Sequence, residues 1–270
     1  MSEREIKSLS IVLPAYRQEK TILQDIKQLD GYLSTLNIPY EILIVFDGLE
    51  DATYTQAKKY TKEHIKHFVI PQNVGKGYAV RYGMLQAESD VVGFIDAGMD
   101  LDPNGIGLLL DYMELLDADI IIGSKLHPDS VVAYPIQRRI LSRGYRLLTR
   151  LMFGFAVRDT QVGLKLFRKE VVEAVFPLLV VKRFAFDVEI LAVAYSLGFT
   201  KIYEAPVKLT FNWGSTIRNF TSQSFWRIIF SMLWDTAAVF YRLKILHFYA
   251  NQKASKTSMK KAPRKQLTGK

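Results

Sequence analysis

The sequence predicts an α/β fold: a mostly parallel, doubly wound sheet with helices on both faces. Two observations predict it. In the first half of the chain, short apolar runs alternate with segments whose apolar residues recur at helical spacing. Several runs are apolar throughout and end abruptly in polar residues, which is typical of strands buried on both faces of a parallel sheet. Because parallel strands need a crossover connection, the alternation indicates right-handed βαβ units.

Each expected element rests on its periodicity and on the residues that end it. Apolar runs that stop at proline, glycine or aspartate are interpreted as strands, and segments with the spacing of Ile22, Ile26, Leu29 and Leu33 as helices. In order, we expect a strand over 9–13, a helix over 21–36, a strand over 40–46, a helix over 51–65, a strand over 67–70, a helix over 77–88, a strand over 91–95, a helix over 104–116 and a strand over 119–123.

The second half is less regular. We expect a basic amphipathic helix over 138–153, a loop leading into a strand over 159–167, a helix over 188–197 and a late strand over 202–209. No linker rich in Pro, Gly or Ser separates these elements from the first half, so residues 1–223 are expected to form one domain.

Composition narrows the class of protein. The chain has 270 residues, of which 49% are hydrophobic, so it can fill a large core. It has no cysteine, which excludes disulfides, zinc–thiolate sites and a cysteine nucleophile. Its first residues, M-S-E-R-E-I-K-S, lack the apolar centre of a signal peptide, so we expect a cytosolic start.

The C-terminal part combines an apolar, aromatic segment over 224–250 with a basic tail over 251–270. Charged residues such as Arg227 and Asp235 interrupt the segment before it reaches the ~20 apolar residues of a spanning helix. An amphipathic helix at the membrane interface, on the cytoplasmic face, is favoured, and packing on the domain's own core or in a dimer is the alternative. The net charge of +9 and the tail suit an anionic membrane; nucleic-acid binding is not expected, because no recognition module accompanies the tail.

Three aspartates, Asp96, Asp100 and Asp102, follow the expected strand over 91–95. Open α/β sheets bind ligands at the carboxyl ends of their strands, and oxygen ligands suit Mg²⁺ or Mn²⁺ together with substrate phosphates. Asp102 precedes Pro103, a pattern typical of a helix N-cap followed by proline at the first helical position, so Asp102 is interpreted mainly as a cap. Asp96, at the strand end, is interpreted as functional, rather than as a simple strand terminator.

A glycine-rich loop, N-V-G-K-G at 73–77, precedes the expected helix over 77–88. Glycine allows close backbone approach, a helix N-terminus attracts anions, and Lys76 and Arg81 add positive charge. The loop suits a phosphate-bearing ligand, but it matches neither a Walker A loop nor a dinucleotide fingerprint, and a plain turn explains it equally well.

Motif order makes the ligand more specific. Pro14-Ala15-Tyr16, Asp47-Gly48, the N-x-G-K-G loop and Asp96 follow successive expected strands, an order that resembles the family 2 glycosyltransferases. The later strings G-S-K at 123–125, R-R-I-L-S-R-G at 138–144, D-T-Q-V-G-L-K-L-F at 159–167 and F-A-F-D-V-E at 184–189 resemble the dolichyl-phosphate (polyprenyl-phosphate) hexosyltransferases, and the glucosyl branch more than the mannosyl branch.

The resemblance, which covers residues 9–210, implies a GT-A fold and roles for individual residues. The implied nucleotide-sugar site consists of Pro14, Tyr16, Asp47, Lys76 and Asp96, and Asp96 would face the metal and the diphosphate. The implied site for the acceptor lipid's phosphate consists of Lys125, Arg139 and Arg143. The residues implied near the sugar and the acceptor are Asp159, Gln161, Asp187 and Glu189.

Three positions depart from the family pattern. P-A-Y-N-E is here P-A-Y-R-Q with Arg17, Phe46 precedes Asp47 in place of a second aspartate, and the D-x-D motif is Asp96-Ala97-Gly98. We consider that Asp100 replaces the missing metal ligand or that Arg17 neutralises the diphosphate in place of a metal.

The function that the resemblance implies is inverting transfer of a hexose from a nucleotide-diphospho sugar to a polyprenyl phosphate at a membrane surface. UDP-glucose is the favoured donor and Mg²⁺ or Mn²⁺ the expected cofactor. The alternatives are a GDP-mannose-dependent enzyme, a family 2 enzyme with another acceptor, and an inactive relative that only binds lipid phosphate or a partner.

Overall fold

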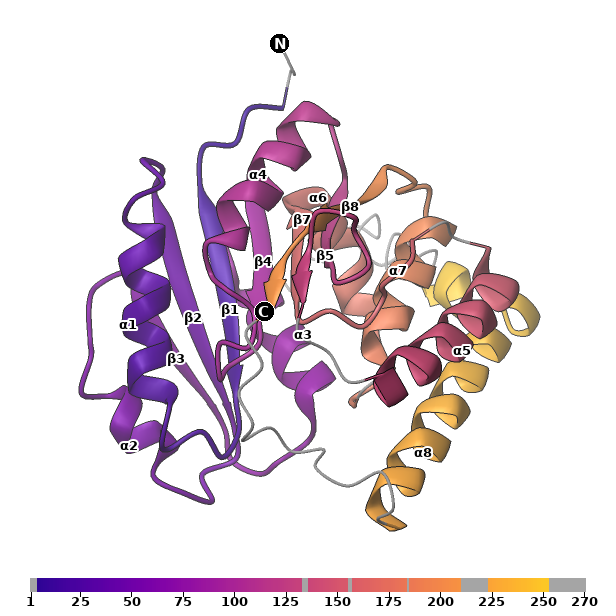
Figure 1. Cartoon of the computed structure of the whole chain (residues 1–270), viewed down its shortest axis with the longest axis horizontal. Coiled ribbons are helices and arrows are strands. Elements are labelled where there is room, and N and C mark those ends of the chain that lie inside the picture. The colour runs from indigo at the N-terminus through magenta and orange to yellow at the C-terminus, as the bar shows by residue number, and fades with distance from the viewer. Residues whose placement is uncertain (1–3, 133–135, 155–156, 184, 210–222, 253–270) are drawn as a thin grey trace, which may run out of the picture.

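A twisted seven-stranded sheet lies between two layers of helices in the computed structural model, which describes residues 4–132, 136–154, 157–183, 185–209 and 223–252 (Figure 1). The strand order is β3-β2-β1-β4-β7-β5-β8. The strands are β1 (Leu9–Ala15), β2 (Tyr40–Asp47), β3 (Ile65–Ile70), β4 (Val91–Ile95), β5 (Ile120–Ser124), β7 (Leu164–Arg168) and β8 (Ile202–Pro206). Neighbouring strands run parallel, except that β7 is antiparallel to both β4 and β5. The predicted α/β fold with a mostly parallel sheet is confirmed.

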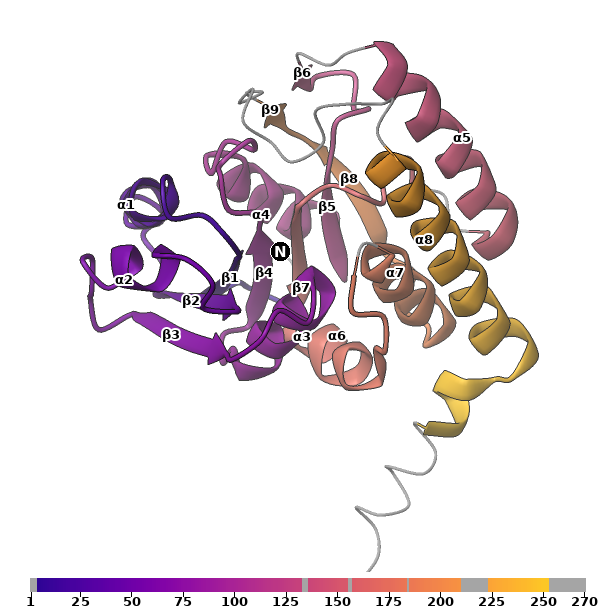
Figure 2. The ribbon, with the colours of Figure 1, turned by 90° about the horizontal axis from the view of Figure 1, so that it is seen from below.

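The sheet has an apolar core on each face, as its continuous apolar strands predict. Every residue of β1, β4, β5 and β7 is buried. Successive side chains point to opposite faces, so Val12 packs with one core and Leu13 with the other. Figure 2 shows α3 and α6 below the sheet and α1 and α4 above it. These helices are α1 (Ile22–Leu33), α3 (Lys76–Gln86), α4 (Gly105–Leu115) and α6 (Lys169–Val175).

The predicted helix over 51–65 is wrong in extent. The helix α2 covers only Thr53–Ala57, and β3 already begins at Ile65. The residues between them turn toward α1, where Tyr60, Lys62 and His64 contact the buried carboxylate of Asp30. These side-chain bonds to a distant residue replace the backbone bonds that a longer helix would make.

The elements of the second half pack at the β5–β8 end of the sheet. They are α5 (Ile136–Phe153), η1 (Phe176–Leu178), α7 (Phe186–Ser196), α8 (Gln223–Phe240) and the π-helical turn η2 (Tyr241–Ile245), followed by helical residues 248–252. The predicted helices over 138–153 and 188–197 are confirmed, whereas α6 and η1 had no counterpart in the prediction. The strand predicted over 202–209 is divided into β8 and β9 (Lys208–Leu209).

A C-terminal helix, α8, lies alongside α5, but it ends at Phe240 and is shorter than the helix predicted over 224–250, whose place at a membrane interface stays a prediction (Figures 1 and 2). Its inner side is buried: Thr236 and Val239 are fully covered, and the Tyr145 and Thr236 hydroxyls are 2.8 Å apart. Its outer side leaves Phe230 and Trp234 exposed. No helix in the described ranges is long and apolar enough to cross a membrane. The basic tail beyond residue 252 lies outside the described residues.

Candidate active site

Four segments meet at the edge of the sheet where its parallel strands end. The strands β1, β2 and β4 run in the same direction, so the residues that follow them share this edge. The antiparallel β7 starts at the same edge, because Leu164, its first residue, pairs with Ile95, the last residue of β4. The amide of Asp96 donates a 2.9 Å hydrogen bond to the carbonyl of Gly163. The inserted strand thus places residues 159–163 beside the carboxylate predicted to be functional.

An ion pair between Lys76 and Asp96 forms the centre of the site. The Lys76 Nζ lies 2.6 Å from Oδ1 and 2.7 Å from Oδ2 of Asp96. Burial lowers the pKa of Lys76, but the Asp96 and Asp187 carboxylates outweigh burial and raise the pKa above its ordinary value, so the ammonium stays charged. A Cβ at Gly163 would lie 2.0 Å from Oδ2 of Asp96, so a larger residue there would displace this carboxylate from its present position. Both partners are partly exposed and accessible to a ligand.

Asp47 holds the N-x-G-K-G loop that carries this lysine. Its carboxylate is buried and accepts 2.8 Å hydrogen bonds from the amides of Val74 and Gly75, as well as one from the Asn73 side chain at 3.1 Å. A carboxylate saturated by loop donors positions that loop. Asp47 therefore lies on the predicted nucleotide-sugar side of the site, where its hydrogen bonds hold the loop that carries Lys76.

The P-A-Y-R-Q segment forms the outer wall on the same side. Pro14 is buried in β1, while Tyr16 is exposed and its hydroxyl donates to Glu50 at 2.8 Å. Arg17 also bonds Glu50, at 2.6 Å, and its guanidinium lies 5.2 Å from the Tyr16 ring centroid. Arg17 has φ +52°, an uncommon value for an arginine, so the surrounding contacts hold it in a strained conformation.

The loop after Asp96 is fixed from two sides. Gly98 has φ +92° and donates its amide to the buried carboxylate of Asp25 at 2.9 Å. Leu101 bridges to Leu209, and the amide of Asp102 donates to the carbonyl of Lys208 at 3.0 Å. Asp102 also accepts the amide of Asn104 at 3.0 Å, but Asn104 is the N-cap of α4 and the helix begins at Gly105, so the prediction that Asp102 caps a helix starting at Pro103 is wrong by two residues.

The carboxylates at this edge allow a divalent cation only in combination with a substrate. Asp25 and Asp102 accept backbone amides, and Gly98 occupies the place of the second aspartate of the D-x-D motif. Within the described ranges, no group of three or more His, Cys, Asp or Glu side chains is arranged to hold a metal ion. Asp96 remains as a partly exposed carboxylate, with Asp100 four residues later in the same loop. One or two carboxylates plus diphosphate oxygens form a donor set that Mg²⁺ and Mn²⁺ accept.

The other side of the site consists of residues from the D-T-Q segment. Asp159 is nearly buried, receives the amide of Lys125 at 3.0 Å and donates its own amide to Glu204 at 2.9 Å. Gln161 places a buried side-chain Nε2 donor there that has no hydrogen-bond partner among the described residues. An unpartnered buried amide donor is costly, so this group suits a ligand oxygen.

Asp187, at the start of α7, is buried against a lysine to which the motifs assigned no role. The Nζ of Lys165 is 2.5 Å from Oδ1 of Asp187 and bonds the carbonyl of Val162 at the same distance. Burial lowers the pKa of Lys165 and raises the pKa of Asp187, against the attraction between the two charges. This pair lies within electrostatic range of Lys76 and Asp96, so charges of alternating sign link the D-T-Q segment to Lys76.

Glu189, unlike the residues above, points away from this centre. Glu189 is fully buried one turn along α7, where its carboxylate accepts the hydroxyl of Tyr249 at 2.6 Å. Arg139 and Arg143 lie one turn apart on α5, and their side chains are outside the described part of the chain.

Sequence reasoning did not identify Lys165, Glu50 and Asp25. The signal for Lys165 was a lysine in the otherwise apolar strand run L-K-L-F, which indicates a buried charge that needs a partner.

Comparison with known proteins agrees with this geometry. Residues 10–176 match the model of glycosyl transferase family 2. Dolichyl-phosphate beta-glucosyltransferase of Drosophila melanogaster is 34% identical over 79% of this chain and 70% of its own length, and the protein of that name from Dictyostelium discoideum is 31% identical with the same coverage. Dolichyl-phosphate beta-glucosyltransferase ALG5A of Trichomonas vaginalis is 33% identical over 74% of this chain and 65% of its own length.

Solved structures share the fold. Glucosyl-3-phosphoglycerate synthase from Mycobacterium tuberculosis in complex with Mn²⁺, UDP-glucose and phosphoglyceric acid aligns with a TM-score of 0.65 and 17% identity, over 86% of this chain and 80% of that one. The same enzyme with Mg²⁺ and UDP aligns with a TM-score of 0.60. The sheet with an antiparallel insertion, the Lys76–Asp96 centre and the family match together identify the chain as a glycosyltransferase that belongs to glycosyl transferase family 2.

Proposed function

We propose that this protein transfers a hexose, with glucose favoured, from a nucleotide-diphospho sugar to a polyprenyl phosphate of the dolichyl type, with inversion at the anomeric carbon. One observation carries the proposal: the Lys76–Asp96 pair and the D-T-Q segment share one edge of the sheet. The names of the relatives support glucose and a dolichyl phosphate acceptor, and the UDP-glucose complex of the similar structure supports UDP-glucose as donor.

In the proposed reaction an oxygen of the lipid phosphate attacks the anomeric carbon of the sugar. The new bond joins that carbon to the phosphate, the bond to the donor diphosphate breaks, and the nucleoside diphosphate leaves with the electron pair. A phosphate monoester is largely ionised near neutral pH, because its second pKa is about 6, so no strong general base is needed. Catalysis then consists of alignment and of neutralising the leaving diphosphate.

Each part of the site has a proposed task in this reaction. Lys76 turns from Asp96 to the donor diphosphate, and the exposed Arg17 adds a second positive charge at the entrance to the site. Lys125, with Arg139 and Arg143 on α5, receives the acceptor phosphate, because clustered cations are its expected partners. The residues proposed to contact the sugar are Asp159, Gln161 and Asp187.

A divalent cation, Mg²⁺ or Mn²⁺, is proposed as cofactor, held by Asp96 and Asp100 together with diphosphate oxygens. When bound, it would supply additional charge stabilisation to the leaving group. Asp100→Ala is expected to raise the Mn²⁺ concentration needed for half-maximal activity at least tenfold. If the dependence on Mn²⁺ is unchanged, Asp100 is not a ligand; if EDTA leaves the activity of the unaltered protein intact, the charge comes from Lys76 and Arg17.

Association with the cytoplasmic face of a membrane is proposed through the α5–α8 surface, the exposed apolar side chains of α5, α8 and the turn after α8. These residues are Leu147, Leu151, Phe230, Leu233, Trp234, Tyr241, Ile245 and Leu246. Exposed Arg150, Arg227 and Lys244 on the same elements provide cations for anionic headgroups. A surface of this composition would bring the acceptor lipid to Arg139 and Arg143 on α5.

The first test is a thermal-shift comparison with UDP, GDP, UDP-glucose and GDP-mannose, each with and without Mn²⁺. A ligand at ~100 times its dissociation constant adds about 2.7 kcal/mol of stability. Stabilisation by UDP and UDP-glucose, followed by transfer of labelled glucose to dolichyl phosphate in vesicles, is the expected result. Stabilisation by GDP-mannose alone would change the donor, and no stabilisation by any nucleotide would favour a relative that only binds lipid phosphate.

A further inference from the structure

The buried carboxylate of Glu189 connects the C-terminal segment to the loop that carries Lys76. Glu189 accepts hydrogen bonds from the amides of Val180 and Val181, the latter at 2.8 Å, and from the hydroxyl of Tyr249 at 2.6 Å. Tyr249, which lies just beyond α8 and η2, is 1% exposed, and Glu189 is fully buried. Burial raises the pKa of Glu189, and these three donors oppose that shift.

The segment that Glu189 holds, residues 180–182, packs directly against the N-x-G-K-G loop that carries Lys76. The amide of Tyr78 donates to the carbonyl of Lys182 at 3.2 Å. A Cβ at Gly75 would lie 2.4 Å from that same carbonyl oxygen, and a Cβ at Gly77 would lie 2.6 Å from the Cβ of Phe186 and 2.9 Å from the carbonyl of Val181. The space beside the two glycines that flank Lys76 is therefore filled by the backbone of residues 181–182 together with the Phe186 side chain.

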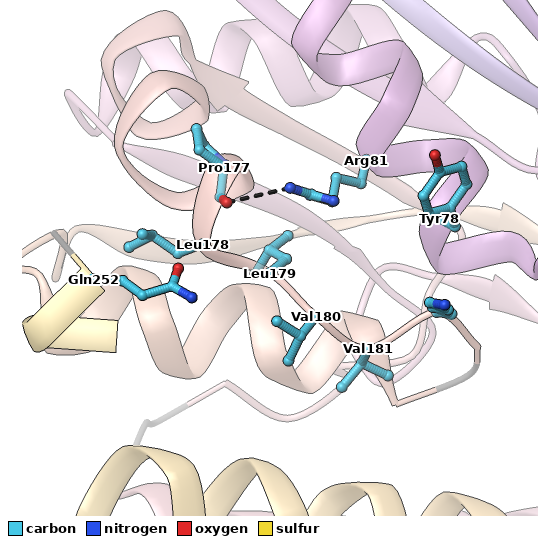
Figure 3. Close-up of a pocket in the computed structure, with 9 residues that line it drawn as sticks. Tyr78, Arg81, Pro177, Leu178, Leu179, Val180, Val181 and Gln252 are labelled. Carbon is cyan, nitrogen blue, oxygen red and sulfur yellow. Dashed lines mark hydrogen bonds between the residues drawn. The ribbon is translucent and has the colours of Figure 1, made fainter. Parts of the chain in front are cut away.

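Packing supports this segment on one side only. Its other side faces a cavity of about 400 Å³, lined by residues 177–182 together with Tyr78, Arg81 and Gln252 (Figure 3). Arg81 fixes the beginning of the segment through the carbonyls of Phe176 and Pro177. Farther along, Leu179 and Val181 are buried in the core while Val180 between them is 38% exposed, so the bonds to Glu189 fix the backbone of the segment in addition to this packing.

We propose that Glu189 is a positioning residue for the donor lysine: with Tyr249, it fixes residues 180–182 against Gly75 and Gly77 and thereby keeps Lys76 directed at the diphosphate site. This inference rests on the proposed donor role of Lys76. In this role Glu189 does not contact the sugar. Donor binding then depends on the position of the C-terminal segment that carries Tyr249.

Hydrogen exchange tests the connection independently of any activity. In Tyr249→Phe, which removes only the hydroxyl, we expect exchange at least fivefold faster in the peptides spanning residues 178–183 and 73–82. Tyr195→Phe, the same change at an exposed position on α7, is the matched control and should leave both peptides unchanged. Faster exchange confined to residues 178–183 would overturn the proposal, even if the protein proves not to transfer glucose.

Nucleotide binding tests the consequence for Lys76. Tyr249→Phe and Glu189→Gln should each weaken binding of UDP at least fivefold and raise the donor KM, with the acceptor KM unchanged. In a Lys76→Met background, Tyr249→Phe should have no further effect on UDP binding, because it acts through the lysine. An equal further loss of UDP binding in the Lys76→Met background, or a loss of kcat with unchanged donor KM, would contradict a positioning role. Glu173→Gln, a change at an exposed position on α6, serves as the control for Glu189→Gln.

Discussion

Lys76 and Asp96 meet across 20 residues of sequence, one from the start of a helix and one from the end of a strand. The pair leaves an ammonium charged and partly exposed at the edge of the sheet, next to a helix N-terminus. Such a group can exchange its carboxylate partner for the more strongly charged diphosphate without unfolding anything around it. The buried Lys165–Asp187 pair behind it cannot do so, because both of its partners are enclosed.

We expect Lys76→Met to lower kcat/KM for the donor by about 10²- to 10³-fold, the usual cost of removing a group that stabilises developing charge. The melting temperature should change little, because the Lys76 side chain is 29% exposed and its partner Asp96 is 39% exposed. Steady-state kinetics with varied donor is the measurement, and Lys59→Met, at an exposed position, is the control. A decrease of less than threefold would remove Lys76 from the donor site.

At the scale of elements, Asp30 joins α1 to the turn between α2 and β3. Its carboxylate is buried and accepts from Tyr60 at 2.7 Å and from Lys62 at 2.6 Å, while Tyr40 and His64 contact the other oxygen. Burial raises the pKa of Asp30, but these partners outweigh burial and hold the pKa below its ordinary value. The network holds the turn after α2 and the start of β3 against α1.

Asp30→Asn should lower the free energy of unfolding by about 2 kcal/mol near pH 6, because hydrogen bonds to a charged group are each worth about 1.5–3 kcal/mol. Since the folded-state pKa is depressed, this stability is fully present above the unfolded-state pKa of about 3.9 and is lost as the pH falls below it toward the folded-state pKa. Urea unfolding at pH 6, 4 and 3 measures the effect. The gap between variant and parent should narrow with acid, and Asp111→Asn, exposed on α4, should show no gap at any pH.

At the scale of the whole molecule, the helices α5 and α8 lie side by side at one end, beyond the β5–β8 side of the sheet (Figure 2). The α5–α8 surface exposes several large apolar side chains; Leu151 and Trp234 are each 77% exposed. Exposed apolar side chains gathered on neighbouring helices are typical of a contact with a membrane or a protein. Because its inner side is packed, α8 remains part of the domain. Its outer side stays exposed for such a contact.

The double variant Phe230→Ser/Trp234→Ser is expected to reduce binding to vesicles of phosphatidylglycerol and phosphatidylcholine at least tenfold, because each buried aromatic side chain contributes about 1.5–3 kcal/mol. Co-sedimentation with the vesicles is the measurement. The double variant should still bind UDP. Leu115→Ser, an 81% exposed leucine on α4, is the matched control. Equal binding of all three proteins would exclude this surface from the membrane contact.

The sequence by itself determined the order of strands and helices in the first half of the chain, the edge at which Asp47, Lys76 and Asp96 gather, and the family. These features follow from local patterns: a buried strand is apolar along its length, and the residues after parallel strands must share an edge. The predicted strand over 91–95 has the observed bounds of β4 because its apolar run ends at a charge on one side and begins after Asp90 on the other.

Only the tertiary structure decided which side chains meet. Nothing near Glu189 in sequence indicates that its partner is Tyr249, 60 residues later, and the single lysine of β7 finds Asp187 only once α7 packs against the sheet. The antiparallel direction of β7 was likewise hidden, because strand direction depends on which neighbours a strand joins. Contacts between buried polar groups depend on how whole layers pack, and one-dimensional periodicity contains no record of that packing.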